Sequence, residues 1–211
     1  VANDYKISRE DQDKMALRSQ NNAQMAQSNG NLAEEILTVK VPQTKGEDII
    51  FNKDEHLRPG STIEKLGKLR PAFQEGGSVT AGNSSGINDG SCALIIASEE
   101  AAREHGLTPK ARILGLSAGG VPPRVMGIGP VPSTKKLMKR LGLKMNDLDL
   151  IELNEAFAAQ GLAVLRELDI KDDDPRVNPQ GGAIALGHPL GASGARLVTT
   201  AMYQLQRENK K

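Results

Sequence analysis

The 211-residue chain contains one cysteine, Cys92, and three histidines, at positions 56, 105 and 188. A lone cysteine excludes an internal disulfide and is typical of a reducing compartment, so we expect a cytoplasmic protein. Cys92 lies among aliphatic residues, where a cysteine is more often a small buried side chain than a nucleophile. The histidines lack the close spacing of metal ligands, so no metal site is predicted.

Aromatic residues make up only 2% of the chain, and the net charge is +1 with no block of like charge. Stacking platforms and basic patches are therefore missing, and no nucleic-acid partner is expected. No apolar run approaches the ~20 residues that span a bilayer, and no signal peptide is visible, so no membrane partner is expected either. Because the chain begins with Val1 rather than Met, we expect further residues before it.

Glycine and proline, by contrast, are concentrated in residues 178–194, where five glycines and two prolines surround His188. Glycine adopts backbone angles that other residues avoid, and proline fixes its own, so this segment predicts a tightly shaped loop. Apolar residues at helical spacing from Ala192 to Leu205 predict a helix directly after it. A histidine in this position is typical of a catalytic imidazole, although a structural histidine in a glycine-rich turn gives the same pattern.

The chain changes character near residue 76. The preceding residues are charged and irregular, with a long polar helix predicted from the Ser8 cap to about Ser28, a strand at 36–41, a polar turn-like stretch at 42–53 and a short helix capped by Ser61. Later in the chain, the predicted strands at 78–81, 91–97, 111–117 and 149–153 alternate with predicted helices at 98–106, 133–142, 155–168 and 192–209. This alternation predicts an α/β layered fold.

Two further segments carry candidate functional groups. Residues 82–90 form a loop of small residues, which either leaves amides and hydroxyls free for a ligand or simply packs as a tight turn. Asn154 and Glu155 follow a predicted strand and open a predicted helix. Ligands gather at that edge of α/β sheets, but helix capping by Asn154, with Glu155 favoured by the helix dipole, explains the same pattern.

Six segments together resemble the thiolase family. They are 54–59 (DEHLRP), 69–73 (LRPAF), 80–90 (TAGNSSGINDG), 126–130 (MGIGP), 154–158 (NEAFA) and 181–194 (GGAIALGHPLGASG). They occur in the family's order and together extend over nearly the whole chain, so the combined resemblance is specific although each glycine-rich piece alone is weak. Within the family, residues 121–132 and 165–168 are most similar to the 3-oxoadipyl-CoA (beta-ketoadipyl-CoA) thiolases of aromatic degradation.

The resemblance implies a layered α/β/α fold of two similar halves, with a loop domain inserted in the first. On that pattern, residues 1–76 are part of the loop domain, residues 77–110 end the first half, and residues 111–211 form most of the second half without its last strands. The composition change near residue 76 agrees with the first boundary. The early strands of the first half would precede Val1, so part of the core is expected to be exposed. Thiolases are usually dimers or tetramers, so a homodimer or homotetramer is expected.

The resemblance also implies an acyl-CoA acyltransferase. A cysteine thiolate takes the acyl group of a 3-oxoacyl-CoA and passes it to free CoA, so CoA is a substrate and no permanently bound cofactor is expected. His188 matches the histidine that activates the nucleophile and helps bind the thioester oxygen. Asn154 matches the asparagine that holds a water of the oxyanion hole. The positions that match CoA-contacting residues are Arg58, Phe73, Ala81, Ser85 and Met126.

Two parts of the family's machinery have no match. The nucleophilic cysteine of the family lies upstream of the position of Val1, its acid/base cysteine lies beyond that of Lys211, and Cys92 matches neither. We therefore expect the 211 residues alone to be inactive. The whole protein that contains them is expected to be an active thiolase. An inactive CoA-binding module is the main alternative. A Ser/His hydrolase using His188 is a third hypothesis, but a Gly-x-Ser-x-Gly elbow is missing.

Overall fold

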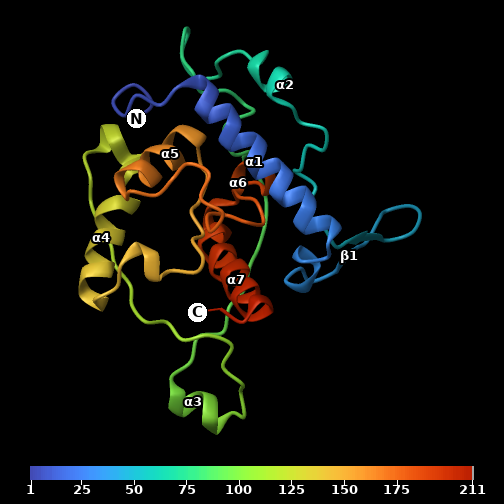
Figure 1. Ribbon diagram of the computed structural model, residues 1–211. Helices are drawn as coiled ribbons and strands as arrows, with labels where there is room; N and C mark the ends of the chain where they lie inside the picture. Colours follow the sequence, from blue (N-terminus) through green and yellow to red (C-terminus); the bar gives the residue numbers. More distant parts are fainter. Residues whose placement is uncertain (211) are drawn as a thin grey trace.

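The computed structural model describes residues 1–210. The α-helices are α1 (Arg9–Ser28), α2 (Ile63–Gly67), α3 (Glu99–Glu104), α4 (Pro130–Leu141), α5 (Ala158–Glu167), α6 (Ala183–Leu186) and α7 (Leu190–Glu208). Short 3-10 helices are η1 (Leu32–Glu34), η2 (Pro123–Ile128) and η3 (Met145–Asp147). The strands β1 (Val39–Val41) and β2 (Ile49–Phe51) form an antiparallel hairpin that projects from the body of the molecule (Figure 1).

Helix α5 lies at the centre of the core. All of its residues from Ala158 to Leu165 are buried, and α1, α4 and η2 pack against it (Figure 1). Small residues in its first half allow α1 to approach closely, because a Cβ at Gly161 would lie 2.6 Å from the Met15 Cε atom. Each fully buried aliphatic side chain, such as Leu162, contributes about 1.5–3 kcal/mol relative to an exposed one. The segments directly before and after α5 are therefore attached to the hydrophobic core.

Helix α1 has the predicted ends and is confirmed. Ser8 Oγ accepts a hydrogen bond from the Asp11 N–H at 3.0 Å, and the helix ends at Ser28. Its buried apolar residues are alanines and a methionine, as the sequence predicts, but four polar side chains are buried on the same helix: Gln12, Asp13, Ser19 and Gln20. Each of the four makes hydrogen bonds to other segments, so α1 holds distant parts of the chain together through polar contacts.

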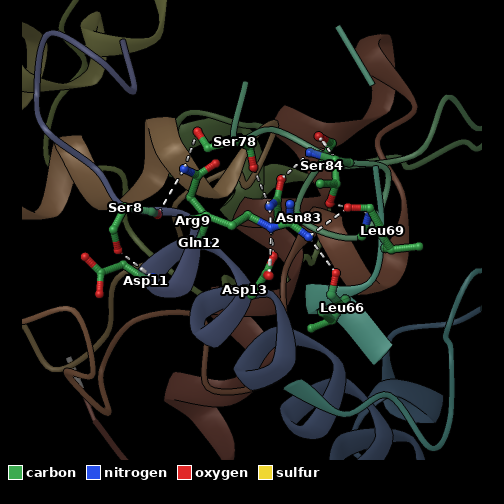
Figure 2. Close-up of polar contacts among 12 residues, drawn as sticks. Ser8, Arg9, Asp11, Gln12, Asp13, Leu66, Leu69, Ser78, Asn83 and Ser84 are labelled. Atoms are coloured by element: carbon green, nitrogen blue, oxygen red, sulfur yellow. Dashed lines mark hydrogen bonds and ion pairs between the residues drawn. The ribbon is translucent and has the colours of Figure 1, made fainter. Parts of the chain in front are cut away.

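A polar network attaches the first turns of α1 to the loop that leads into residues 80–90 (Figure 2). Asp13 forms an ion pair with Arg9 at 2.8 Å and accepts a hydrogen bond from Asn83 Nδ2 at 2.9 Å. Arg9 also donates to the carbonyl groups of Leu66 and Leu69. The carbonyl of Asn83 in turn accepts from the Ala158 N–H at 2.9 Å, at the start of α5. The network therefore positions the 80–90 loop against α5.

Most of the predicted strands are wrong. The predicted strand at 36–41 survives as β1, whereas β2 lies in the stretch predicted to be a turn. The segments 78–81, 91–97, 111–117 and 149–153 form no strand. Within residues 1–210 the first and the last contribute one isolated bridge each, Thr80 with Pro71 and Ile151 with Val177, and the other two contribute none. A strand exists only where a neighbour completes its ladder of hydrogen bonds, and these segments have no such neighbour among the described residues.

Four helices begin at other residues than predicted; one of them is α7, which begins at Leu190 rather than at residue 192. Thr62, not Ser61, caps α2 by accepting from the Lys65 N–H. Ser133 lies inside α4, because the prolines at 130 and 132 suit a first turn and allow the helix to start earlier. Helix α5 begins at Ala158 rather than at residue 155, so Asn154 is not its cap and the capping explanation for Asn154 is wrong.

The segments on either side of α3 are largely exposed. Helix α3 is capped by Ser98, as predicted, and stands apart from the rest of the molecule at the end of two extended stretches (Figure 1). Ile95 and Ile96 on one stretch are 86% and 75% exposed, and Leu114 and Leu116 on the other are 66% and 75% exposed. No helix within residues 1–210 is long and apolar enough to cross a membrane.

Candidate active site

His188 lies in the turn between α6 and α7. Gly187 before it has φ of +94°, a left-handed conformation that glycine adopts without strain, and Pro189 after it caps α7. The ring is held at one end by Ser193 in the first turn of α7, with 2.7 Å between Nδ1 and Oγ. Ser193 Oγ donates its own proton to the Pro189 carbonyl at 3.1 Å, so it accepts from Nδ1–H. The loop therefore fixes both the position and the tautomer of the ring.

Asn154 lies at the other end of the ring. Its Nδ2 donates to His188 Nε2 at 3.3 Å, which agrees with a proton on Nδ1 and a lone pair on Nε2. Burial, and then the positive charge of Arg196, lower the pKa of His188 below its usual value. The imidazole is therefore neutral near pH 7, with Nε2 able to take a proton. Asn154 Oδ1 is buried and has no hydrogen-bond partner among the described residues.

Glu155 joins two parts of the site: residues 154–158, here called the Asn154 segment, and residues 187–189, here called the His188 loop. Its carboxylate is 1% exposed and accepts hydrogen bonds from Ser19 Oγ at 2.6 Å, Asn178 Nδ2 at 2.8 Å and the Ile184 N–H at 3.2 Å. Burial raises the pKa of Glu155, and these three hydrogen bonds act in the opposite direction. Gly182 lies against the carboxylate and leaves no space for a side chain. Because Glu155 directly follows Asn154, its hydrogen bonds connect Asn154 to α1 through Ser19 and to α6, just before His188, through Ile184.

Ser85 and Phe73 lie next to the Asn154 segment. The Ser85 N–H donates to the Ala156 carbonyl at 3.0 Å, and Ser84 pairs with Phe157 in an isolated antiparallel bridge. Phe73 makes an edge-to-face contact with Phe157, with 5.8 Å between ring centroids, and is 69% exposed. The structure therefore brings two of the residues expected to contact CoA close to Asn154.

The other three expected residues lie on the surface. Arg58 is exposed, and its backbone N–H donates to Gln20 Oε1 at 2.9 Å. Ala81 is exposed at the start of the 80–90 loop, and Met126 is 73% exposed in η2. Within residues 1–210, none of these three forms a hydrogen bond or an ion pair with His188. Cys92 is half-buried, with its Sγ 3.3 Å from Thr199 Oγ1. No group of three His, Cys, Asp or Glu side chains suited to a metal is found in the described chain.

The sequence does not predict two residues that hold His188, and for Glu155 it leaves open whether the helix dipole or a functional site explains its position. Ser193 lies in the recognised motif, but nothing in its spacing shows that its hydroxyl faces Nδ1. Asn88 is 100 residues from His188 and accepts its backbone N–H at 3.1 Å. The helix-dipole explanation for Glu155 is wrong, because α5 begins only at Ala158 and Glu155 is a buried hydrogen-bond acceptor for three segments. Only the fold brings these partners together.

Arg196 Nη1 donates a hydrogen bond to Glu152 Oε2 at 3.1 Å, and the Glu152 side chain is 4% exposed. Burial raises the pKa of Glu152 from 4.5 to about 8, although Arg196 lowers it in part. Because the folded-state pKa lies above that of the unfolded chain, the unfolded chain binds fewer protons between pH 4.5 and 8, and stability falls as the pH rises through this window. Between pH 5 and pH 8, ionisation of Glu152 is expected to lower the free energy of unfolding of the wild type by roughly 3 kcal/mol. Glu152→Gln cannot ionise, so its free energy of unfolding should not show this decrease.

Urea unfolding of both proteins at the two pH values measures this difference. His56 and His188 have lowered pKa values, so they destabilise the fold as the pH falls, but they do so equally in both proteins. The same pH dependence in wild type and variant would contradict the assignment.

Comparisons with known proteins identify the family of the chain. The thiolase N-terminal domain family matches residues 1–100, and the thiolase C-terminal domain family matches residues 107–211. A beta-ketoadipyl-CoA thiolase from Pseudomonas putida is 62% identical over 207 residues, which are 98% of this chain and 52% of that protein. The chain thus spans about half the length of the curated relatives it matches.

Solved structures agree as well. The Bacillus anthracis acetyl-CoA acetyltransferase matches with a TM-score of 0.95 and 46% identity, covering 100% of this chain and 52% of that one. Human mitochondrial 3-ketoacyl-CoA thiolase in complex with CoA matches with a TM-score of 0.91 and 45% identity, covering 100% and 51%. The predicted thiolase-like fold is thereby confirmed for the part of the fold that the chain spans. The chain belongs to the thiolase family.

Proposed function

We propose that the whole protein containing this chain is a thiolase that cleaves 3-oxoadipyl-CoA with CoA to succinyl-CoA and acetyl-CoA. The observation that carries the proposal is the pair formed by His188 and Asn154, in which a neutral imidazole directs the Nε2 lone pair towards an amide donor. The choice of substrate is supported by the 62% identity with the beta-ketoadipyl-CoA thiolase from Pseudomonas putida.

In this proposal His188 is the general base. Nε2 takes the proton of the cysteine thiol, and the thiolate attacks the 3-oxo carbon of the substrate. The bond between C2 and C3 then breaks, C2 takes a proton, and acetyl-CoA leaves while the succinyl group stays on sulfur. The CoA thiol attacks this thioester and releases succinyl-CoA, which returns the cysteine. A histidine with a lowered pKa suits the first step because it is unprotonated at neutral pH.

Asn154 is proposed to stabilise the negative charge that develops on an oxygen of the substrate. Its Oδ1 is buried without a partner among residues 1–210, and a buried acceptor of this kind is commonly satisfied by water. A water held there would direct its free proton to the oxyanion, next to His188. Preorganised donors of this type are worth about 10²–10³-fold in rate.

CoA is proposed to bind along the surface formed by the 80–90 loop and its neighbours. The contact between Phe73 and Phe157 supports this placement, because it holds an exposed apolar ring beside the Asn154 segment. An arginine suits the phosphates of the nucleotide, and small residues let the pantetheine arm approach the backbone. The residues proposed to contact CoA are Arg58, Phe73, Ala81, Ser85 and Met126.

The proposal places the reactive cysteines outside this chain. We expect the 211 residues alone to form no acetyl-CoA from 3-oxoadipyl-CoA and CoA, because the covalent step lacks its nucleophile. The whole enzyme is expected to form it in equal amount to succinyl-CoA, as measured by chromatography and mass spectrometry. Thiolysis by the 211 residues alone would overturn the assignment of the nucleophile.

The intact mass of the protein from its natural source separates this proposal from the CoA-binding module. A mass about twice the 22.5 kDa of this chain, together with thiolysis, supports the enzyme. A mass of 22.5 kDa with CoA binding and no thiolysis supports the module. A hydrolase would turn over simple esters and lose this activity on His188→Ala.

The cytoplasmic location, the homodimer or homotetramer and the domain boundaries at 76 and 110 stay predictions.

A further inference from the structure

The side chain of Asn88 lies between two of the three histidines of the chain. Its Oδ1 accepts the backbone N–H of His188 at 3.1 Å, and its Nδ2 is 3.3 Å from His56 Nδ1. These contacts join the 80–90 loop, the segment before Arg58 and the turn between α6 and α7. No other described side chain is recorded with hydrogen bonds to both histidines.

The hydrogen-bond chemistry allows only one orientation of the Asn88 amide. The backbone N–H of His188 can only donate, so the amide oxygen must face it and the amide NH₂ must face His56. His56 Nδ1 therefore accepts and carries no proton, which makes the ring neutral with its proton on Nε2. Burial, and then the positive charge of Arg58, lower the pKa of His56, which favours this neutral form.

Two glycines make room for the amide. A Cβ at Gly187 would lie 2.6 Å from Asn88 Cγ, and a Cβ at Gly86 would lie 2.7 Å from Asn88 Oδ1 and 2.5 Å from His56 Cε1. Real side chains do not approach so closely, so the backbone reaches the amide only because both positions are glycine. The amide of Asn88 therefore packs between Gly187, the residue before His188, and Gly86, which lies in the same 80–90 loop as Asn88.

We propose that Asn88 is a positioning residue for His188: held by His56, it fixes the backbone of His188 so that Nε2 stays within reach of Asn154. This inference rests on the proposed function, because it concerns the same imidazole. Asn88 acts through the backbone of the loop and is assigned no contact with the substrate. A displacement of a catalytic group by about 1 Å can cost about 10²-fold in rate, so a side chain that fixes the loop has a measurable effect on kcat.

Two variants of Asn88 test the proposal in the whole enzyme. Asn88→Ala removes both contacts, and we expect kcat to fall by about 10²-fold while KM changes little. Asn88→Asp keeps an oxygen for the His188 N–H, so we expect it to restore kcat to within about tenfold of wild type. The matched control is Asn146→Ala, an exposed asparagine in η3, which should leave kcat unchanged. A normal kcat in Asn88→Ala, or an Asn88→Asp variant no better than Asn88→Ala, would overturn the proposal.

Proton NMR titration of the whole enzyme, with the signals of His56 and His188 assigned from alanine variants of these residues, provides a readout independent of activity. In Asn88→Asp the new carboxylate faces His56 and should raise its pKa, while the signals of His188 stay near their wild-type positions. In Asn88→Ala the signals of His188 should move. If Asn88→Ala fails to fold, the Asp variant still decides: an unchanged pKa of His56 overturns the contact. If the wild-type enzyme lacks thiolysis but the titrations behave as expected, the proposed function fails and the positioning of His188 stands.

Discussion

Replacing His188 with alanine is expected to lower the rate of 3-oxoadipyl-CoA thiolysis by the whole enzyme by about 10²–10⁴-fold, the usual contribution of a general acid or base. Alanine has no group to take the thiol proton, and it also leaves Asn154 Nδ2 without its acceptor. The loss should appear in kcat, because the surface proposed to bind CoA is formed mainly by other segments. Steady-state kinetics with both substrates measures the effect.

His105 provides the matched control for this experiment. It is an exposed histidine at the C-terminal end of α3, a helix that stands apart from α5 and α7 in Figure 1, and His105→Ala should keep the wild-type rate. The pH profile gives a second check: because the pKa of His188 is lowered, kcat/KM of the wild type should stay level until the pH drops below 6.5. A His188→Ala enzyme with a near-normal rate would refute the role of this residue.

Gly182→Ala is expected to destabilise the chain by about 3 kcal/mol or more. The added Cβ would lie 2.2 Å from Glu155 Cδ and 2.5 Å from each carboxylate oxygen. Glu155 has no free space to move into, since it is buried and bonded to Ser19, Asn178 and Ile184. A shift of the carboxylate breaks these bonds and leaves buried donors unsatisfied, which adds to the cost of the steric overlap.

The control for this substitution is Gly194→Ala. Gly194 occupies an exposed position in α7, and no atom lies within 4 Å of a Cβ added there. In a helix, alanine is more stable than glycine by up to about 1 kcal/mol. Urea unfolding of the 211-residue chain compares the two variants directly. Equal midpoints for Gly182→Ala and Gly194→Ala would show that Glu155 does not require the glycine.

The helices were easier to predict than the strands. Caps and glycine stops act within a few residues, so the ends of α1 could be predicted from Ser8 and from the Asn29–Gly30 stop. A strand depends on a partner elsewhere in the fold, and the segments at 91–97 and 111–117 have none among the described residues. Their apolar composition therefore predicted strands that the structure does not contain.

The sequence by itself determined the family, because its motifs are local and occur in a fixed order, and it predicted His188 and Asn154 as candidate site residues. Only the tertiary structure decided what holds these residues. The hydrogen bond from Ser19 to Glu155 joins residues 136 positions apart, and that from the His188 N–H to Asn88 joins residues 100 apart. A motif records which residues are present, but the tautomer of His188 follows from its contacts with Ser193 and Asn154. The rigidity of its loop arises from hydrogen bonds that form only when α1, the 80–90 loop and α6 meet.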